Sequence, residues 1–439
     1  MVMIAQLILS LSILIVLHEL GHFVPAKLFK TRVEKFYLFF DPGFELFKHK
    51  IGETEYGIGW LPLGGYVKIS GMIDESMDTE QMKQPPQPWE FRSKPAWQRL
   101  IIMLGGVTVN FILGLLIFAG VLWFYGQSYL PTENATYGIA VDSTGYELGL
   151  RDGDHVLSIN GEPFEKFNSR TLKREIVING AREMVVQRDD QEVVINIDPT
   201  YQDVLSRHAN RYVEIFAPRR LFIVDAFSDV SPAKEAGLAI GDSIVTLDGA
   251  STPYFHQFLK AIKGKEDQDV ELGFYRDGAL KQLTIRTTDE GKIGVGAIGF
   301  DMERQNFTFA EAIPAGFSLG WMTLTDQLKA FGAMFRGDIK VTESLGGFAS
   351  IGSLFGGEWI WERFWIMTAT LSLILAFMNL LPIPALDGGH VVFLLYEVAT
   401  GRKPSDKFME YATIIGFVIV LGLVILANGL DIKRFLFGG

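Results

Sequence analysis

The sequence contains no cysteine in its 439 residues. The chain therefore forms no disulfide, binds no metal through thiolates and has no cysteine nucleophile. If it binds a metal, the ligands must come from histidine, aspartate and glutamate. Histidine is itself scarce, with seven in the whole chain, so a close pair of histidines is informative.

Clusters of basic residues interleaved with aromatic residues are also missing, and the formal net charge is -11. We therefore do not expect a nucleic acid as partner. Hydrophobic residues make up 48% of a chain that is long enough for two or three domains. This composition predicts a protein with both membrane-embedded and water-exposed parts.

Four stretches are apolar and long enough to cross a bilayer, which takes about 20 residues. We expect membrane helices at 1–27, 100–125, 363–390 and 408–430. The first lacks a basic segment and a cleavage site, so we interpret it as a retained helix and not as a signal peptide. The third contains Pro382 and Pro384, which cannot continue a regular helix. Such a break at membrane depth requires protein or a wet cavity beside it.

The distribution of Lys and Arg predicts the orientation of these helices. Basic residues flank the loop at 28–99, whereas residues 126–150 contain none. We therefore expect the 28–99 loop to be cytoplasmic and the region between the second and third helices to lie on the other side of the membrane.

That outer region contains an internal repeat. The segment GLRDGDHVLSINGEPF from residue 149 aligns with GLAIGDSIVTLDGAST from residue 237, an offset of 237 - 149 = 88 residues. Each copy has a short apolar strand between turn signals, a pattern that resembles tandem PDZ domains. We expect PDZ-like domains at 126–217 and 218–305, followed by an interfacial amphipathic linker at 306–362. The alternative is a pair of β modules that act only as spacers.

The segment SILIVLHELGHFVPAK, residues 12–27, carries His18, Glu19 and His22 within the first predicted helix. Residues four apart share one helix face. In HExxH, two imidazoles bind zinc and the glutamate activates a water molecule. Ionisable groups inside a membrane span are costly and are kept mainly at functional sites. The alternative is a pair of interfacial histidines beside a snorkelling glutamate.

A catalytic zinc ion needs a third protein ligand and one open position. The Pro-broken segment NLLPIPALDGGH supplies two candidates, Asp387 and His390. Two neutral imidazoles with one carboxylate leave a Zn2+ site net positive, which favours ionisation of its water. We favour Asp387 as the ligand, with His390 as its rival; Asp387 alone is also typical of a turn residue.

Together, HELGH, the PDZ-like repeat and NLLPIPALDGGH resemble the site-2 protease family of intramembrane zinc metalloproteases, over nearly the whole chain. The resemblance implies a multi-pass α-helical membrane protein with four transmembrane helices and two β-rich PDZ-like domains inserted between helices 2 and 3. It implies that His18, His22 and Asp387 bind Zn2+ and that Glu19 is the general base. It also implies a bacterial inner membrane location, with periplasmic PDZ domains and a zinc site towards the cytoplasm.

The resemblance further implies residues that handle substrate. Asn379 lies in the matching NLLPIPALDGGH segment, and Asn110 in LGGVTVN resembles the asparagine of a Gly-Pro-x-x-Asn motif, although Val107 replaces its proline. SLGGFASIG likewise lacks the proline expected after Gly347. YGIGWLPLGGYVKIS, from residue 56, resembles a membrane-associated β-hairpin whose edge pairs with unwound substrate. Its candidate residues are Gly64, Gly65, Tyr66 and Val67; the alternative is an ordinary interfacial hairpin.

The implied function is regulated intramembrane proteolysis of single-pass membrane proteins that another protease has trimmed, such as anti-sigma factors and remnant signal peptides. The PDZ domains are expected to contact substrate ends or ectodomains. One alternative is a membrane-anchored PDZ scaffold with an inactive zinc site, but a structural site needs no carboxylate like Glu19. A zinc transporter is a further alternative, disfavoured because one HExxH and one Asp form no ligand path across a membrane.

Overall fold

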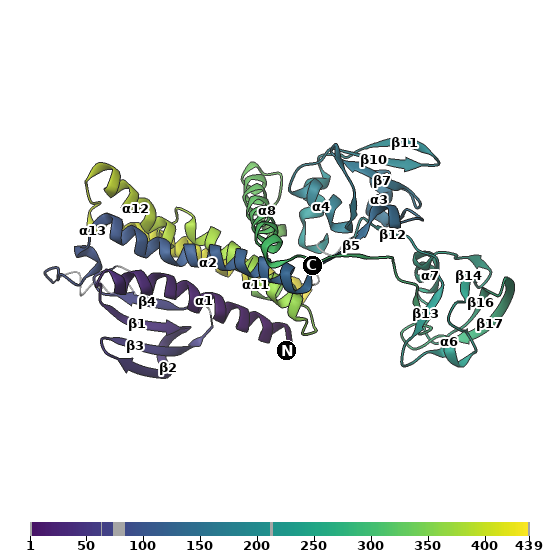
Figure 1. Ribbon diagram of the computed structural model, residues 1–439, viewed down its shortest axis with the longest axis horizontal. Helices are drawn as coiled ribbons and strands as arrows, with labels where there is room; N and C mark the ends of the chain where they lie inside the picture. Colours follow the sequence, from purple (N-terminus) through teal and green to yellow (C-terminus); the bar gives the residue numbers. More distant parts are fainter. Residues whose placement is uncertain (1, 63, 73–83, 211–213, 438–439) are drawn as a thin grey trace. The chain divides into compact units, whose positions relative to one another are not determined.

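The computed structural model describes residues 2–62, 64–72, 84–210 and 214–437. Residues 73–83 of the predicted cytoplasmic loop and 211–213 of the predicted first PDZ-like domain therefore lie outside the described residues. The chain divides into two compact units (Figure 1). The first comprises Met1–Gly126, Asn306–Phe335 and Val341–Gly439, and the second comprises Gln127–Gln305 and Arg336–Lys340.

Within the described residues, four helices of the first unit are long and apolar enough to cross a membrane. They are α1 (Val2–Leu28), α2 (Ala96–Tyr125), α11 (Trp361–Leu380) and α13 (Asp406–Phe437). The third predicted helix, 363–390, is not continuous. It ends at Leu380, before the two prolines, and a separate helix α12 (Asp387–Thr400) begins at Asp387.

Glycines bring α1 and α2 into close contact. A Cβ added at Gly21 would lie 2.5 Å from the carbonyl oxygen of Gly105, so a larger residue would separate the two helices. Small residues at helix interfaces allow such backbone contact within membranes. Farther along α2, a Cβ at Gly114 would meet the Leu373 side chain of α11 at 2.7 Å. The helix α2 is therefore packed between α1 and α11.

A four-stranded sheet lies beside α1 (Figure 1). Its strands are β1 (Val33–Leu38), β2 (Phe40–Ile51), β3 (Thr54–Leu61) and β4 (Tyr66–Ile69), in the order β2-β3-β1-β4. The predicted hairpin from residue 56 to residue 70 is wrong, because β1 lies between β3 and β4; the hairpin is formed by β2 and β3. The strand β4 is thus an edge, paired only with β1 among the described strands.

The second unit contains two β-rich modules, each with its own hydrophobic core. The first module contains β5 (Gln127–Pro131), β6 (Ile139–Val141), α3 (Ser143–Leu148), β7 (His155–Ile159), β8 (Glu162–Pro163), β9 (Lys166–Phe167), α4 (Ser169–Val177), β10 (Glu183–Arg188), β11 (Gln191–Asn196), α5 (Tyr201–Ser206) and β12 (Phe216–Pro218). The second contains β13 (Val224–Phe227), α6 (Pro232–Glu235), β14 (Ser243–Leu247), β15 (Ala250–Ser251), α7 (Phe255–Ile262), β16 (Asp269–Arg276), β17 (Ala279–Arg286) and β18 (Val295–Ala297), followed by β19 (Glu303–Gln305).

The 88-residue repeat extends to a buried ion pair. Arg188 contacts Asp154 at 2.8 Å, and Arg276 contacts Asp242 at 2.6 Å. Both partners are offset by the same interval, since 242 - 154 = 88 and 276 - 188 = 88. The two modules are therefore related in their tertiary contacts as well as in their turn motifs.

The segment 306–362, expected to be an interfacial amphipathic linker, is largely helical, with α8 (Phe309–Arg336), α9 (Val341–Ser344) and α10 (Phe348–Ser353). The helix α8 meets α2 where Gly316 packs on the backbone of Ala119. Large exposed apolar residues follow one another every four positions along it: Phe309, Ile313, Phe317 and Trp321. This stripe is consistent with an interfacial helix, which stays a prediction.

Candidate metal centre

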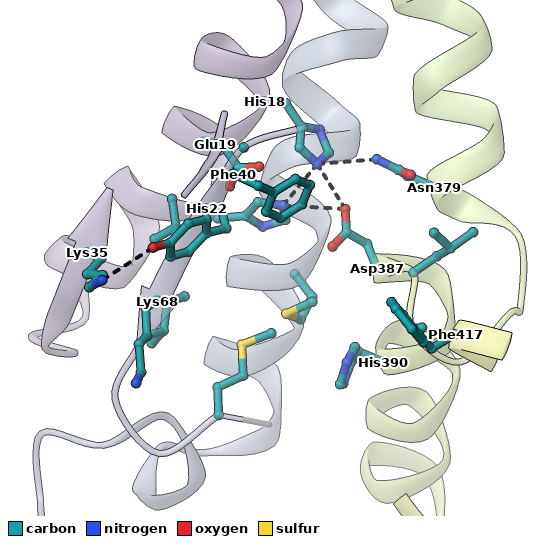
Figure 2. A pocket seen from close by; sticks show the side chains of 18 of the residues that line it. His18, Glu19, His22, Lys35, Phe40, Lys68, Asn379, Asp387, His390 and Phe417 are labelled. Atoms are coloured by element: carbon teal, nitrogen blue, oxygen red, sulfur yellow. Dashed lines mark hydrogen bonds and ion pairs between the residues drawn. The ribbon is translucent and has the colours of Figure 1, made fainter. Parts of the chain in front are cut away.

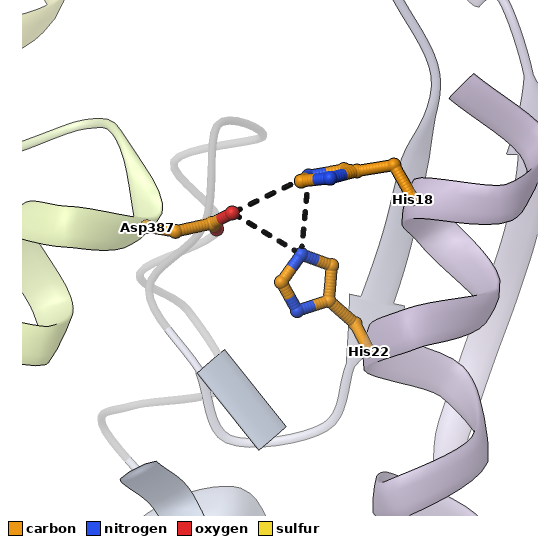
Figure 3. A group of neighbouring side chains, drawn as sticks. All are labelled: His18, His22 and Asp387. Carbon is orange, nitrogen blue, oxygen red and sulfur yellow. Dashed lines mark hydrogen bonds and ion pairs between the residues drawn. The ribbon is translucent and has the colours of Figure 1, made fainter. Parts of the chain in front are cut away.

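Two histidines of α1 and the first residue of α12 converge on one point (Figure 3). Asp387 Oδ2 lies 3.3 Å from His18 Nε2 and 3.3 Å from His22 Nε2. The two Nε2 atoms are also 3.3 Å apart. Within the described ranges, this is the one group of three or more such side chains close enough to share a metal ion.

The triangle of ligand-type atoms fits a zinc ion. Atoms bound tetrahedrally at about 2.0–2.1 Å from zinc lie about 3.3 Å from one another. Asp387 Oδ2 is buried without a hydrogen-bond partner, which is rare for a buried carboxylate. A cation between the three atoms would satisfy this oxygen and the lone pairs of both imidazoles. His390 lines the same cavity but lies outside the triangle (Figure 2).

Both imidazoles are oriented by α2. His22 Nδ1 lies 2.8 Å from the carbonyl oxygen of Ile102, to which it donates, and this leaves Nε2 facing the triangle. Asn110 Nδ2 lies 3.3 Å from His18 Nδ1. Asn110 is only 1% exposed and does not line the cavity, so it lies behind His18 and not in the cavity.

His18, His22 and Asp387, called the triad below, line a cavity of about 750 Å³ within the first unit (Figure 2). Glu19 lines this cavity beside the histidines, as does Val67 of β4. Asn379, near the end of α11, also lines the cavity, with its side-chain nitrogen 3.3 Å from His18 Nε2. The HExxH glutamate and the asparagine therefore flank the triad from two different helices.

The edge strand β4 forms one wall of the cavity. Gly65, Tyr66 and Val67 line it, whereas Gly64 does not and packs against the ring of Phe40. A Cβ at Gly65 would lie 2.6 Å from Ile15 Cγ2, so glycine allows the strand to approach α1. Three of the four predicted edge residues thus face the space beside Glu19.

The sequence pattern did not indicate several other cavity residues. Lys35 and Asp41 form an ion pair at 3.6 Å, and Tyr66 donates to Asp41 at 3.0 Å. Thr413 and Phe417 contribute a wall from α13. Their positions depend on strand order and helix packing, which have no local sequence signal.

The SLGGFASIG segment lies against α13 instead of lining the cavity. Asn428 Oδ1 accepts a hydrogen bond from the N–H of Phe348 at 3.2 Å. A Cβ at Gly347 would lie 2.8 Å from the same oxygen, so glycine is needed for the contact.

Comparison with known proteins shows which protein family the sequence matches. A sequence model described as "Peptidase family M50" matches residues 6–423. The chain is 28% identical to "Putative zinc metalloprotease" of Rickettsia conorii, covering 99% of each protein. It is 28% identical to "Regulator of sigma-E protease RseP" of Escherichia coli and 27% identical to the protein of that name from Salmonella typhimurium, in both cases over 98% of each protein. The similarity therefore includes both units.

Proposed function

The chain belongs to peptidase family M50, and we propose that it is a zinc metalloendopeptidase that performs intramembrane proteolysis. The observation that carries the proposal is the joint position of His18, His22, Asp387 and Glu19 in one cavity beside helices that can span a membrane. The names of the relatives support zinc as the metal and regulated proteolysis as the setting. The similarity to bacterial regulators of sigma-E protease also supports the bacterial inner membrane as the location.

In this proposal His18, His22 and Asp387 would hold the metal, which would act as a Lewis acid on the scissile carbonyl and lower the pKa of a water molecule. Glu19 takes a proton from the attacking water and delivers it to the leaving amine. Asn379 can donate from its amide nitrogen to the carbonyl oxygen as negative charge develops there.

The substrate in this proposal is a single transmembrane segment. A helix hides its carbonyls in internal hydrogen bonds, so a stretch must unwind and find other partners before attack. Among the described strands β4 pairs only with β1, and its other edge lies in the cavity wall, where such a stretch could add to the sheet as a further strand. Gly65, Tyr66 and Val67 would then hold substrate through the backbone, independently of its side chains.

For the second unit we propose two PDZ domains that select substrates by their ends or ectodomains. The 88-residue repeat, the two separate cores and the insertion between α2 and α11 support this assignment. The distribution of basic residues supports periplasmic modules and a zinc site towards the cytoplasm. The relatives named as regulators of sigma-E protease support trimmed anti-sigma factors, and with them remnant signal peptides, as substrates.

The test compares wild type with Glu19→Gln, using purified full-length protein, metal analysis and a model transmembrane substrate. The amide keeps the size of the side chain and removes the base, so zinc should be retained and cleavage abolished. Glu162→Gln, at an exposed position in β8, is the matched control and should cleave normally. Wild type without bound zinc, or Glu19→Gln activity within about tenfold of wild type, would contradict the proposal.

A further inference from the structure

One face of α2 follows the two histidines of α1. Ile102, Gly106 and Asn110 recur every four residues, so they lie along one stripe of the helix. The carbonyl of Ile102 contacts His22, and the side chain of Asn110 contacts His18. Between them, a Cβ at Gly106 would lie 2.6 Å from His18 Cε1. Glycine at that position makes room for the imidazoles against the helix.

The contact of Asn110 with His18 contains a mismatch. The Asn110 side chain is buried, and its Oδ1 has no hydrogen-bond partner. The neighbour of His18 Nδ1 at 3.3 Å is instead the amide nitrogen, which is a donor. The choice between oxygen and nitrogen in an amide side chain follows from its hydrogen bonds and is decided by the partner.

The partner is fixed by the geometry of the triad. His18 directs Nε2 towards His22 and Asp387, so a His18 that binds metal through Nε2 carries its proton on Nδ1. That Nδ1–H needs an acceptor. Exchanging the oxygen and nitrogen of the Asn110 amide places Oδ1 next to His18 Nδ1–H. The buried oxygen then accepts a hydrogen bond from that group.

Helix α11 fixes the backbone of α2 around Asn110. Ser372 Oγ of α11 donates to the main-chain oxygen of Asn110 at 2.7 Å. One turn farther along α2, Gly114 packs against Leu373. The part of α2 that carries Asn110 is thus held against α11, which suits a residue that must orient another side chain.

We propose that Asn110 is a positioning residue of the metal centre, whose Oδ1 accepts a hydrogen bond from His18 Nδ1–H and so presents Nε2 to zinc. The inference rests on the proposed function of the triad as a zinc site. Each imidazole then has one acceptor on α2, the Ile102 carbonyl for His22 and the Asn110 amide for His18. Such outer partners fix the tautomer and the ring orientation of a ligating histidine.

The test measures zinc affinity of the purified full-length protein by competition with a chelator, without substrate. Asn110→Leu keeps a similar size but removes the acceptor, and zinc affinity should fall about 10- to 100-fold. Asn110→Asp keeps an acceptor oxygen, and its affinity should stay within about threefold of wild type or exceed it. Ile112→Ala, at an exposed position of the same helix, is the control and should keep wild-type zinc affinity.

Wild-type affinity in Asn110→Leu would overturn the inference. So would an equal loss in Asn110→Asp, because the acceptor would then not be what matters. If Asn110→Leu does not fold, Asn110→Ala takes its place, with the same expected loss relative to Asn110→Asp. Absence of zinc from the wild type would contradict the proposed function, whereas zinc in the wild type with indifference at position 110 contradicts this inference alone.

Discussion

At the scale of single residues, the histidine pair could be predicted because four-residue spacing on a helix fixes a shared face without any tertiary information. The third ligand could not be chosen in this way. Asp387 and His390 are both in NLLPIPALDGGH, and only the break after Leu380 and the start of α12 at Asp387 decide which of them meets α1. The role proposed for Asn110 also required the structure, since its sequence resemblance pointed to substrate.

The ligand assignment predicts a difference between those two neighbours. His18→Ala, His22→Ala and Asp387→Ala should each lose zinc and activity, because each removes one of three ligands. His390→Ala should retain zinc, since it lies outside the triangle. Metal analysis of the four purified variants checks this. Loss of zinc from His390→Ala, with retention in Asp387→Ala, would exchange the two roles.

At the scale of elements, hydropathy predicted the four long apolar helices, but the sheet order had no local signal. The segment from residue 56 to residue 70 has strand-forming residues on both sides of a glycine pair, which is typical of a hairpin. The parallel pairing of β1 with β3 instead inserts β1 between the two strands. This arrangement leaves β4 at the edge, next to Glu19.

The proposed edge pairing predicts the effect of Val67→Pro. Proline has no N–H, so the variant disturbs the backbone edge offered to substrate. Loss of backbone bonds at roughly 1 kcal/mol each should slow cleavage about tenfold or more, with unchanged zinc content. The measurement is the cleavage rate, and Leu46→Pro at an unpaired position of β2, the opposite edge strand, is the control.

A second substrate tests whether the defect of Val67→Pro concerns the pairing of unwound substrate. A transmembrane segment with Gly or Pro near the scissile bond unwinds more easily and depends less on the strand edge, so its cleavage by Val67→Pro should be partly rescued. Equal rates of wild type and Val67→Pro on both substrates would mean that β4 does not pair with substrate.

The repeated ion pair predicts matched losses of stability in the two modules. Asp242→Asn weakens the pair with Arg276 inside the second module, and Asp154→Asn does the same with Arg188 in the first. Each loss should be about 1–3 kcal/mol, because the charge-assisted hydrogen bonds reach a buried carboxylate. Hydrogen exchange of the full-length protein should show faster exchange of β16 in Asp242→Asn and of β10 in Asp154→Asn. Equal effects of either variant on both modules would contradict independent cores.

The same ion pair gives the second module a pH dependence. Burial raises the pKa of Asp242, but hydrogen bonds from Arg276 and from the N–H of Ala239 outweigh it, so the pKa lies below its ordinary value of 3.8. A carboxyl with a lowered pKa stabilises the folded state above its ordinary pKa, and this contribution is lost as the pH falls through the folded value. In the wild type, the protection of β16 against hydrogen exchange should therefore decrease when the pH is lowered below about 4, and it should change less in Asp242→Asn.

At the scale of the whole molecule, the family predicted from HELGH and NLLPIPALDGGH is confirmed by a match over residues 6–423. His22 and Asp387, which are 365 residues apart along the chain (387 - 22 = 365), lie within 3.3 Å of each other. The prediction succeeded because both motifs carry chemistry that membrane helices otherwise exclude. The relation between the repeat and substrate choice has no such signal in the sequence and stays a prediction.

The second unit leaves and rejoins the first through adjacent strands, and this allows a clean deletion. In β5 and β19, Tyr129 lies opposite Glu303 and Gln127 lies opposite Gln305. Replacing residues 130–302 by a short Gly-rich turn would join the two strands as a hairpin and leave the triad, the cavity and β4 intact.

If the modules filter substrates by size, this variant should cleave substrates with a long folded ectodomain as well as trimmed ones, whereas wild type should cleave only the trimmed ones. The readout is the ratio of the two cleavage rates, with Glu19→Gln in the deletion background to show that cleavage comes from the same site. If the deletion variant retains zinc and its ratio equals that of wild type, substrate selection lies in the first unit. The walls of the cavity and the edge of β4 are then the surfaces that remain to select substrate.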